Sequence, residues 1–197
     1  MSRREFVGSI AACALPAPEG TRWRVLDLGP HCVLRESLAG FGSVGVPACV
    51  EPAGRQECWI AAGVGALSDA VARRLSAFLS DGGWLVFESA AGFGGFEEQR
   101  RMLARHFALR IGRPVDLWEQ GAAPYIDYTW PARVKVRDFS RVVPFSGDGC
   151  EVIGFAGRLP VAARRGRFVF LGSPIGPGLL AGEREARAWL SALFPGI

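Results

Sequence analysis

The stretch LSDAVARRLSAFLSDGGWLVFES, residues 67–89, contains a complete helix, a turn and a strand. Its apolar residues recur at helical spacing and predict one buried face: Leu67, Val71, Leu75, Phe78 and Leu79. Ser68, near the start of this run, can cap the helix, and Asp81-Gly82-Gly83 after the run supplies a stop. The apolar run WLVF at 84–87 follows at once and predicts a strand.

The same alternation of helix and strand extends in both directions. Strands are predicted at 22–28, 44–50, 58–62, 84–87, 115–118, 133–136, 151–155, 160–163 and 168–171, and helices at 34–41, 67–79, 96–107 and 183–194. The run CWIAA at 58–62 shows no polar alternation, which indicates a central parallel strand covered on both faces. We therefore expect an α/β fold: a doubly wound, mainly parallel flavodoxin-like sheet with helices on both faces and a C-terminal β-hairpin.

Length and composition indicate one folded domain. The chain has 197 residues, of which 49% are hydrophobic and 21% charged, which is sufficient for a buried core. The net charge is +4, but no aromatic residues are interleaved with the arginine clusters at 100–105 and 164–167. We therefore expect no nucleic-acid partner. No apolar stretch approaches the roughly 18 residues that a membrane span needs, and the oligomeric state stays open.

Residues 1–20 are expected to be a leader that precedes a single domain at 21–197. SRREFV at 2–7 closely resembles the twin-arginine export signal S-R-R-x-F-L, and an apolar run at 7–15 follows it. Ala12-Cys13-Ala14 fits a signal cleavage site, while IAAC at 10–13 fits a lipobox with Cys13 as the lipidated residue. The alternative is an ordinary disordered start on a cytoplasmic protein.

The five cysteines give no metal signal, because no two of them form a CxxC pair. Neither a metal nor another cofactor is expected. In an oxidising compartment a disulfide among Cys32, Cys49, Cys58 and Cys150 is an option, and buried free thiols are the other.

Three segments together carry a family resemblance. They are a helix that ends in LSDGG at 79–83, the strand WLVF at 84–87, and a hairpin that leads into GRFVFLGSP at 166–174. Their order and pattern, over roughly residues 22–195, resemble the class I glutamine amidotransferase-like superfamily, especially its non-catalytic and trehalose-utilisation-type members.

An active member of that superfamily places a cysteine in a G-x-C-x-G turn and a histidine-proline-glutamate run after the last strand. In that arrangement, the tight turn exposes the thiol and the histidine activates it. Here the two matching turns read FESAAG at 87–92 and GSPI at 172–175, with Ser173 in the place of the histidine. The resemblance therefore implies a domain that has lost glutamine hydrolysis, because the nucleophile, its base and the glutamate are all missing.

Glu88 and Ser89 are the candidate catalytic residues, because they follow a strand at the point where it opens into the crevice. A carboxylate there can act as an acid or base or bind sugar hydroxyls, whereas an ion pair or a capping role is the structural alternative. Ser89 needs a base, and His31 is a better candidate than His106.

Candidate ligand-binding residues stand at strand ends and in the aromatic segment 124–131, which we predict to be an ordered loop. They combine glycine turns, aromatic faces, carboxylates and a guanidinium: Gly63, Gly65, Gly94, Tyr125, Asp127, Trp130, Arg137, Asp138 and Ser173. Such a set suits a small polar or glycan-like ligand, and it equally suits a packed loop.

The sequence thus predicts a degenerate amidotransferase-like domain that binds a small polar or carbohydrate-like ligand or a partner protein. One alternative is a carbohydrate-acting hydrolase or isomerase that uses Glu88 with Asp127 or Asp138. The other is a structural or accessory module whose crevice is plugged by the aromatic loop.

Overall fold

The computed structural model describes residues 22–50, 57–138, 141–147 and 149–194. The predicted export leader, including Cys13, lies outside these residues and stays a prediction. The described chain forms a mixed α/β fold around one nine-stranded sheet, in the order β2-β1-β3-β4-β11-β10-β9-β6-β7.

The first five strands of that order are parallel. They are β2 (Ala48–Cys49), β1 (Arg22–Leu26), β3 (Glu57–Val64), β4 (Trp84–Ser89) and β11 (Phe168–Leu171). Counted along the parallel part alone, this is the 2-1-3-4-5 order of flavodoxin-like sheets. The predicted parallel core is therefore present, with its switch point between β1 and β3.

The other four strands extend the sheet in antiparallel fashion. They are β10 (Leu159–Arg165), β9 (Glu151–Ala156), β6 (Tyr125–Tyr128) and β7 (Val134–Arg137). A separate two-stranded sheet pairs β5 (Arg110–Ile111) with β8 (Phe145–Ser146).

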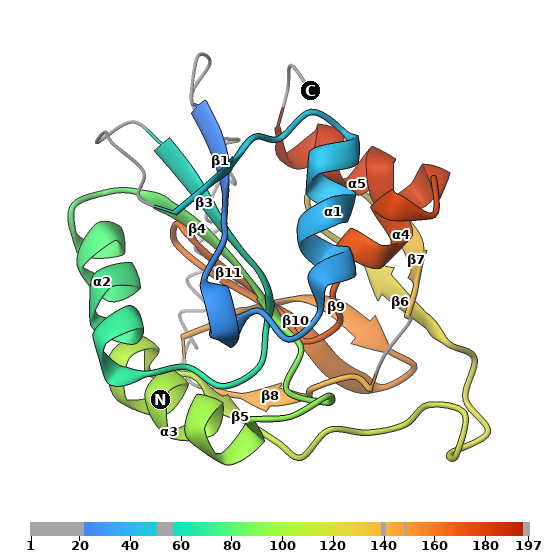
Figure 1. Ribbon diagram of the computed structural model, residues 1–197. Helices are drawn as coiled ribbons and strands as arrows, with labels where there is room; N and C mark the ends of the chain where they lie inside the picture. The colour runs from blue at the N-terminus through green and yellow to red at the C-terminus, as the bar shows by residue number, and fades with distance from the viewer. Residues whose placement is uncertain (1–21, 51–56, 139–140, 148, 195–197) are drawn as a thin grey trace, which may run out of the picture.

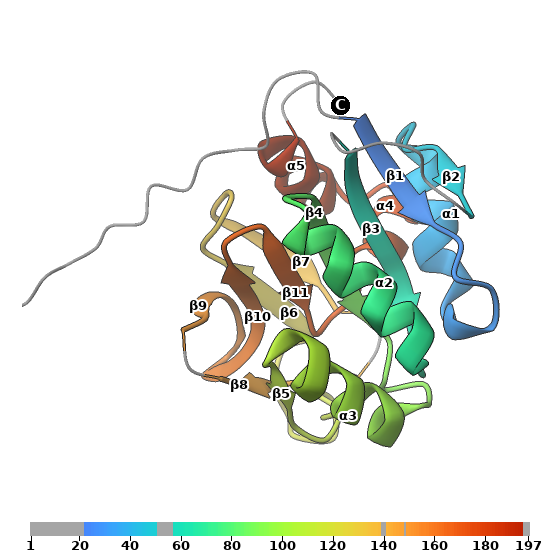
Figure 2. The same ribbon diagram turned by 90° about the vertical axis from the view of Figure 1, so that its left-hand side faces the viewer.

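Helices cover both faces of the sheet (Figure 1). On one face lie α1 (Arg35–Ser43), the short α4 (Gly176–Leu180) and α5 (Arg184–Leu193). On the other lie α2 (Asp69–Ser80) and α3 (Phe96–Phe107), which run side by side in front of the sheet in Figure 2. A 3₁₀ turn, Gly29–His31, joins β1 to the segment before α1.

Strand β3 shows why both faces need cover. Every residue of β3 is buried, and its side chains alternate between the two hydrophobic clusters. Cys58 and Ile60 belong to the cluster under α1, α4 and α5, whereas Trp59 and Ala61 belong to the cluster under α2 and α3. An uninterrupted apolar run is what this two-sided burial requires.

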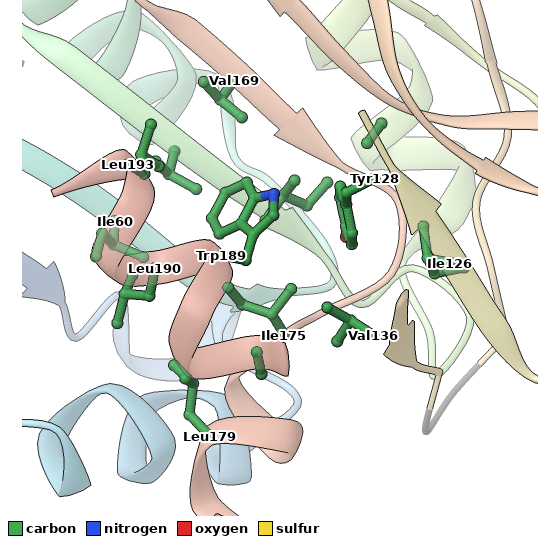
Figure 3. Packing of buried hydrophobic residues seen from close by; sticks show 14 of the residues in the cluster. Ile60, Ile126, Tyr128, Val136, Val169, Ile175, Leu179, Trp189, Leu190 and Leu193 are labelled. Atoms are coloured by element: carbon green, nitrogen blue, oxygen red, sulfur yellow. The ribbon is translucent and has the colours of Figure 1, made fainter. Parts of the chain in front are cut away.

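Trp189 of α5 is the largest fully buried side chain on the first face. Its ring lies between strand residues and the turn before α4 (Figure 3), with its centroid 5.4 Å from that of Tyr128. Its indole nitrogen donates a hydrogen bond to the Trp130 carbonyl oxygen at 3.1 Å. This residue therefore ties the last helix to the antiparallel part of the sheet.

Three sequence predictions were wrong in detail. The strand predicted at 44–50 is reduced to Ala48–Cys49. The segment 115–118 is not a strand. Val115 makes one isolated bridge to Val142, and the Asp116 carboxylate accepts a hydrogen bond from the Trp118 amide where the chain turns. The predicted loop at 124–131 contains β6, whose alternation was masked because tyrosines occupy both its exposed and its buried face.

Helix α2 begins as predicted at a serine cap. The Ser68 hydroxyl accepts a hydrogen bond from the Val71 amide at 3.4 Å, which satisfies one of the free N–H groups of the first turn. We expect Ser68→Ala to lower the free energy of unfolding by about 1 kcal/mol in urea denaturation. Ser80→Ala, at the exposed other end of the helix, is the control and should change it by less than about 0.5 kcal/mol.

Candidate functional site

The turns after β4 and β11 meet at one edge of the sheet. The two strands are parallel neighbours, with Leu171 paired to Glu88, so their carboxyl ends point the same way. In sheets of this type ligands bind beyond those ends. Glu88 and Ser173 therefore lie at the edge of the sheet where a ligand is expected.

Glu88 is completely buried, with 0% of its surface exposed. One carboxylate oxygen, Oε1, accepts hydrogen bonds from the amides of Ile175 (2.9 Å) and Gly176 (3.1 Å). The other, Oε2, accepts one from the Gly63 amide at 3.3 Å. The carboxylate thus joins two segments of backbone, the end of β3 and the start of α4, and it does not contact solvent.

Burial raises the pKa of Glu88 to about 7, although the three amides and the nearby Ser37 hydroxyl all act to lower it. The Ser37 oxygen itself is buried and makes no hydrogen bond of good geometry, so we attribute the opposing effect mainly to the amides. Here the cost of removing the charged carboxylate from water exceeds the stabilisation that the backbone N–H donors provide, because water is wholly excluded.

Ser89 lies on the opposite face of the sheet from Glu88, because successive side chains of a strand alternate. Its hydroxyl is fully buried and donates to Gln99 Oε1 of α3 at 2.5 Å. Gln99 in turn donates to the carbonyl oxygens of Val64 and Gly65. This network connects α3 to the end of β3, and it places Ser89 away from Glu88 and without a histidine partner.

The two histidines have other partners. His31 Nδ1 lies 3.2 Å from the Ala66 carbonyl oxygen, and His106 Nε2 lies 2.9 Å from Asp69 Oδ1. The four described cysteines are free thiols. Burial raises the pKa of three of them, Cys32, Cys49 and Cys58, so the reactive thiolate is disfavoured.

Two of the glycines predicted to bind a ligand, Gly63 and Gly65, are closely packed, whereas a Cβ atom added at Gly94 would meet nothing within 4 Å. A side chain at Gly63 would lie 2.4 Å from the Leu34 carbonyl oxygen, and one at Gly65 would lie 2.7 Å from Val33. The Gly94 carbonyl oxygen approaches Gly65 in the same way, at 3.0 Å. Gly63 and Gly65 are therefore enclosed by backbone and side-chain atoms of neighbouring segments, directly over the end of β3.

A cavity of about 590 Å³ opens beside this closed region. It is lined by residues of three separate segments: Gly92, Phe93, Asp116, Trp118, Arg137, Asp138 and Arg141. Trp118 and Phe93 are 68% and 54% exposed, so two aromatic faces are accessible. Two carboxylates and two guanidinium groups complete the lining, with charges that balance.

Asp138 is the most deeply buried charged group of this cavity, at 5% exposure. Its Oδ1 accepts a hydrogen bond of 2.6 Å from the Ser173 hydroxyl, which connects the end of β7 to the turn after β11. Across the cavity, Arg141 pairs with Asp116 at 3.8 Å. The structure therefore brings together three of the predicted residues, Arg137, Asp138 and Ser173.

The other aromatic candidates lie elsewhere. Tyr125 is 43% exposed on β6 and does not line the cavity. Asp127 pairs with Lys135 at 3.3 Å and lines a different cavity of about 670 Å³, between the β6–β7 hairpin and α5. Trp130 packs under the guanidinium of Arg164, 4.7 Å from its ring centroid. None of these three is among the residues that line the cavity with Asp138.

Five lining residues were not among the predicted site residues: Gly92, Phe93, Asp116, Trp118 and Arg141. Trp118 carried a usable signal, since a tryptophan in an irregular polar stretch has no apolar stripe to join. The Asp116 carboxylate accepts hydrogen bonds from the amides of Trp118 and Glu119. This is a common turn arrangement, and it stabilises the loop.

Within the ranges that the structure describes, no group of three or more histidine, cysteine or acidic side chains converges as a metal site would require. The described helices are also too short or too polar to cross a bilayer.

No family model matches the chain, and no curated protein matches it. Solved structures do. An α-L-fucosidase isoenzyme 2 from Paenibacillus thiaminolyticus is 11% identical, with a TM-score of 0.58 over 89% of this chain and 33% of its own. The GH42 β-galactosidase Gan42B from G. stearothermophilus is 13% identical, with a TM-score of 0.54 over 86% of this chain and 30% of its own.

A glutamine amidotransferase is 16% identical, with a TM-score of 0.48 over 87% of this chain and 98% of its own. The chain thus spans about a third of the length of the two glycosidases that it resembles. At these identities the likeness to the two glycosidases establishes a shared α/β fold and nothing about activity.

Proposed function

We propose that this chain is an amidotransferase-like domain without glutaminase activity, which binds a small polar, carbohydrate-like ligand in the cavity beside Asp138. The observation that carries the proposal is the lining of that cavity. It combines exposed aromatic faces with a buried carboxylate and guanidinium groups, at the carboxyl edge of the sheet where such folds bind ligands.

The loss of glutaminase chemistry is supported by the residues at the two turns. The two buried residues that end β4, Glu88 and Ser89, include no thiol. Ser173 stands where a histidine would be needed, and its hydroxyl donates a hydrogen bond to Asp138. In the described part of the chain, no cysteine is hydrogen-bonded to His31 or His106. A thiol without a base is a poor nucleophile at neutral pH.

A sugar ring fits the cavity in chemical terms. Sugars present apolar C–H faces that pack on aromatic rings, and hydroxyls that hydrogen-bond to carboxylates and guanidinium groups. Trp118 and Phe93 offer the first kind of contact, and Asp138 and Arg137 offer the second. The volume of about 590 Å³ lies within the usual range for small-molecule sites.

The hydrolase or isomerase alternative requires Glu88 to reach a substrate. Glu88 is fully buried and Asp127 lines another cavity, which counts against a pair of cooperating carboxylates. The accessory-module alternative gains support from the closed packing over Glu88. The segments that close it belong to α1 and to the turn before α4, in place of the aromatic loop that the sequence suggested.

We expect Trp118→Ala to weaken binding of a monosaccharide ligand at least about tenfold, because the exposed indole supplies the apolar contact area. Binding is measured by saturation-transfer NMR and calorimetry with methyl galactoside, methyl fucoside, methyl glucoside, glucuronate and glucosamine. Val50→Ala, at an exposed apolar residue remote from the cavity lining, is the matched control and should bind as the wild type does.

Two results would contradict the proposal. One is release of glutamate from glutamine by the purified chain. The other is the absence of binding across the panel, or binding that Trp118→Ala leaves unchanged, which would favour a partner protein or a site elsewhere.

A further inference from the structure

The turn at 173–176 lies between Glu88 and the cavity. Its inner end is held by Glu88, since the amides of Ile175 and Gly176 both donate to the Oε1 atom. Its outer end is Ser173, whose hydroxyl donates to Asp138 in the cavity wall. Only one residue, Pro174, separates the two contacts, and its ring restricts the backbone between them.

The turn has little freedom to move in another direction. A side chain at Gly176 would lie 2.4 Å from the Ser37 backbone, and one at Gly40 would lie 1.9 Å from the Gly176 carbonyl oxygen. On the side of the sheet, a side chain at Gly172 would lie 2.0 Å from the Val143 carbonyl oxygen. A displacement at Gly176 is therefore transmitted along the turn, because packed backbone cannot absorb it.

We infer that Glu88 is a positioning residue for the candidate cavity: it holds the 173–176 turn from beneath and thereby places Ser173, which in turn positions Asp138 in the cavity wall. The inference rests on the proposed use of that cavity. Glu88 itself touches no ligand, so its role differs from that of a catalytic acid or base. Loss of its charge should weaken the two amide contacts, since hydrogen bonds to an ionised acceptor are the stronger ones.

The groups around Glu88 allow its titration to be followed separately from theirs. Two titratable groups of the described chain whose pKa the Glu88 charge raises are the Cys32 thiol, from the segment before α1, and the Tyr128 phenol of β6. Burial raises the pKa of both, so neither ionises near neutral pH. Asp138 and Glu183 also act on Tyr128. Glu88 meets uncharged groups otherwise: three backbone amides and Ser37.

The test follows backbone amides of the full chain by NMR between pH 6 and pH 8.5, without any ligand. In the wild type, the amides of Gly63, Ile175 and Gly176 should titrate with a common midpoint near pH 7, the pKa of Glu88. The amides of Ser173 and Asp138 should show the same midpoint. In Glu88→Gln all five should lose it, while the dispersed spectrum of a folded protein remains.

A second variant keeps the test decisive if Glu88→Gln does not fold. In Ser173→Ala, the Ile175 and Gly176 amides should still titrate, whereas Asp138 should no longer follow them. The inference is overturned if Ser173 and Asp138 stay flat in the wild type while Gly176 titrates, or if they titrate unchanged in Glu88→Gln. Because no ligand is present, these outcomes are independent of whether a sugar binds.

Discussion

Gly40→Ala is expected to lower the free energy of unfolding by about 3 kcal/mol or more, at the upper end of the cost of overpacking. Gly40 lies in α1 where that helix meets the turn into α4, and its added methyl group would lie 1.9 Å from the Gly176 carbonyl oxygen and 2.6 Å from its carbonyl carbon. Both partners are backbone, so no side-chain rotamer can relieve the contact. The two helices would have to separate.

Gly42→Ala is the matched control in the same helix. An added methyl group there meets nothing within 4 Å, and the position is exposed. Alanine is the better helix former, so this variant should gain about 0.5–1 kcal/mol. Urea denaturation of the two variants beside the wild type measures both effects. Equal and small changes would mean that α1 and α4 do not approach each other as closely as described.

The second large effect is a pH dependence of stability that belongs to Glu88. Its pKa is about 7 in the folded protein against an ordinary 4.5, so between these values the folded state retains a proton that the unfolded chain has lost. Raising the pH removes that proton, and stability must therefore fall with pH through this window. The total loss is on the order of 3 kcal/mol.

Glu88→Gln removes this contribution to the pH dependence of stability. We expect the difference in unfolding free energy, wild type minus variant, to be most favourable to the wild type near pH 4.5, to decline up to about pH 7 and then to level off. Urea denaturation at a series of pH values gives this difference, in which the other titrating groups largely cancel. A difference that grows with pH would show that the three amide donors outweigh burial, so that the folded pKa of Glu88 is depressed.

Local patterns in the sequence were sufficient to predict the central strands of the parallel sheet and the helix between them. The helix at 67–79 and the strands at 58–62 and 84–87 were recognisable because helix and strand periodicity, caps and glycine stops all act between close neighbours. The antiparallel strand β6 was missed for the same reason. Its pairing partners, β9 and β7, lie on either side in the sheet, and the segment itself carries tyrosines on both faces.

The candidate site was only partly predictable. That Glu88 and Ser173 stand at neighbouring strand ends follows from the order of elements, and so does the absence of a cysteine and a histidine from those two turns. Which residues share a surface does not. Glu88 and Ser89 are adjacent in sequence, yet strand alternation directs them to opposite faces of the sheet, toward α4 and toward Gln99 of α3.

The sequence by itself determined the central parallel strands, the four longer helices and the chemistry missing from two turns, because these depend on neighbouring residues. Only the tertiary structure decided that backbone from α1 and α4 closes over Glu88, and that Phe93, Trp118 and Asp138 line one cavity. Those contacts join segments at least 20 residues apart, and they form because each buries a surface that another segment happens to complement.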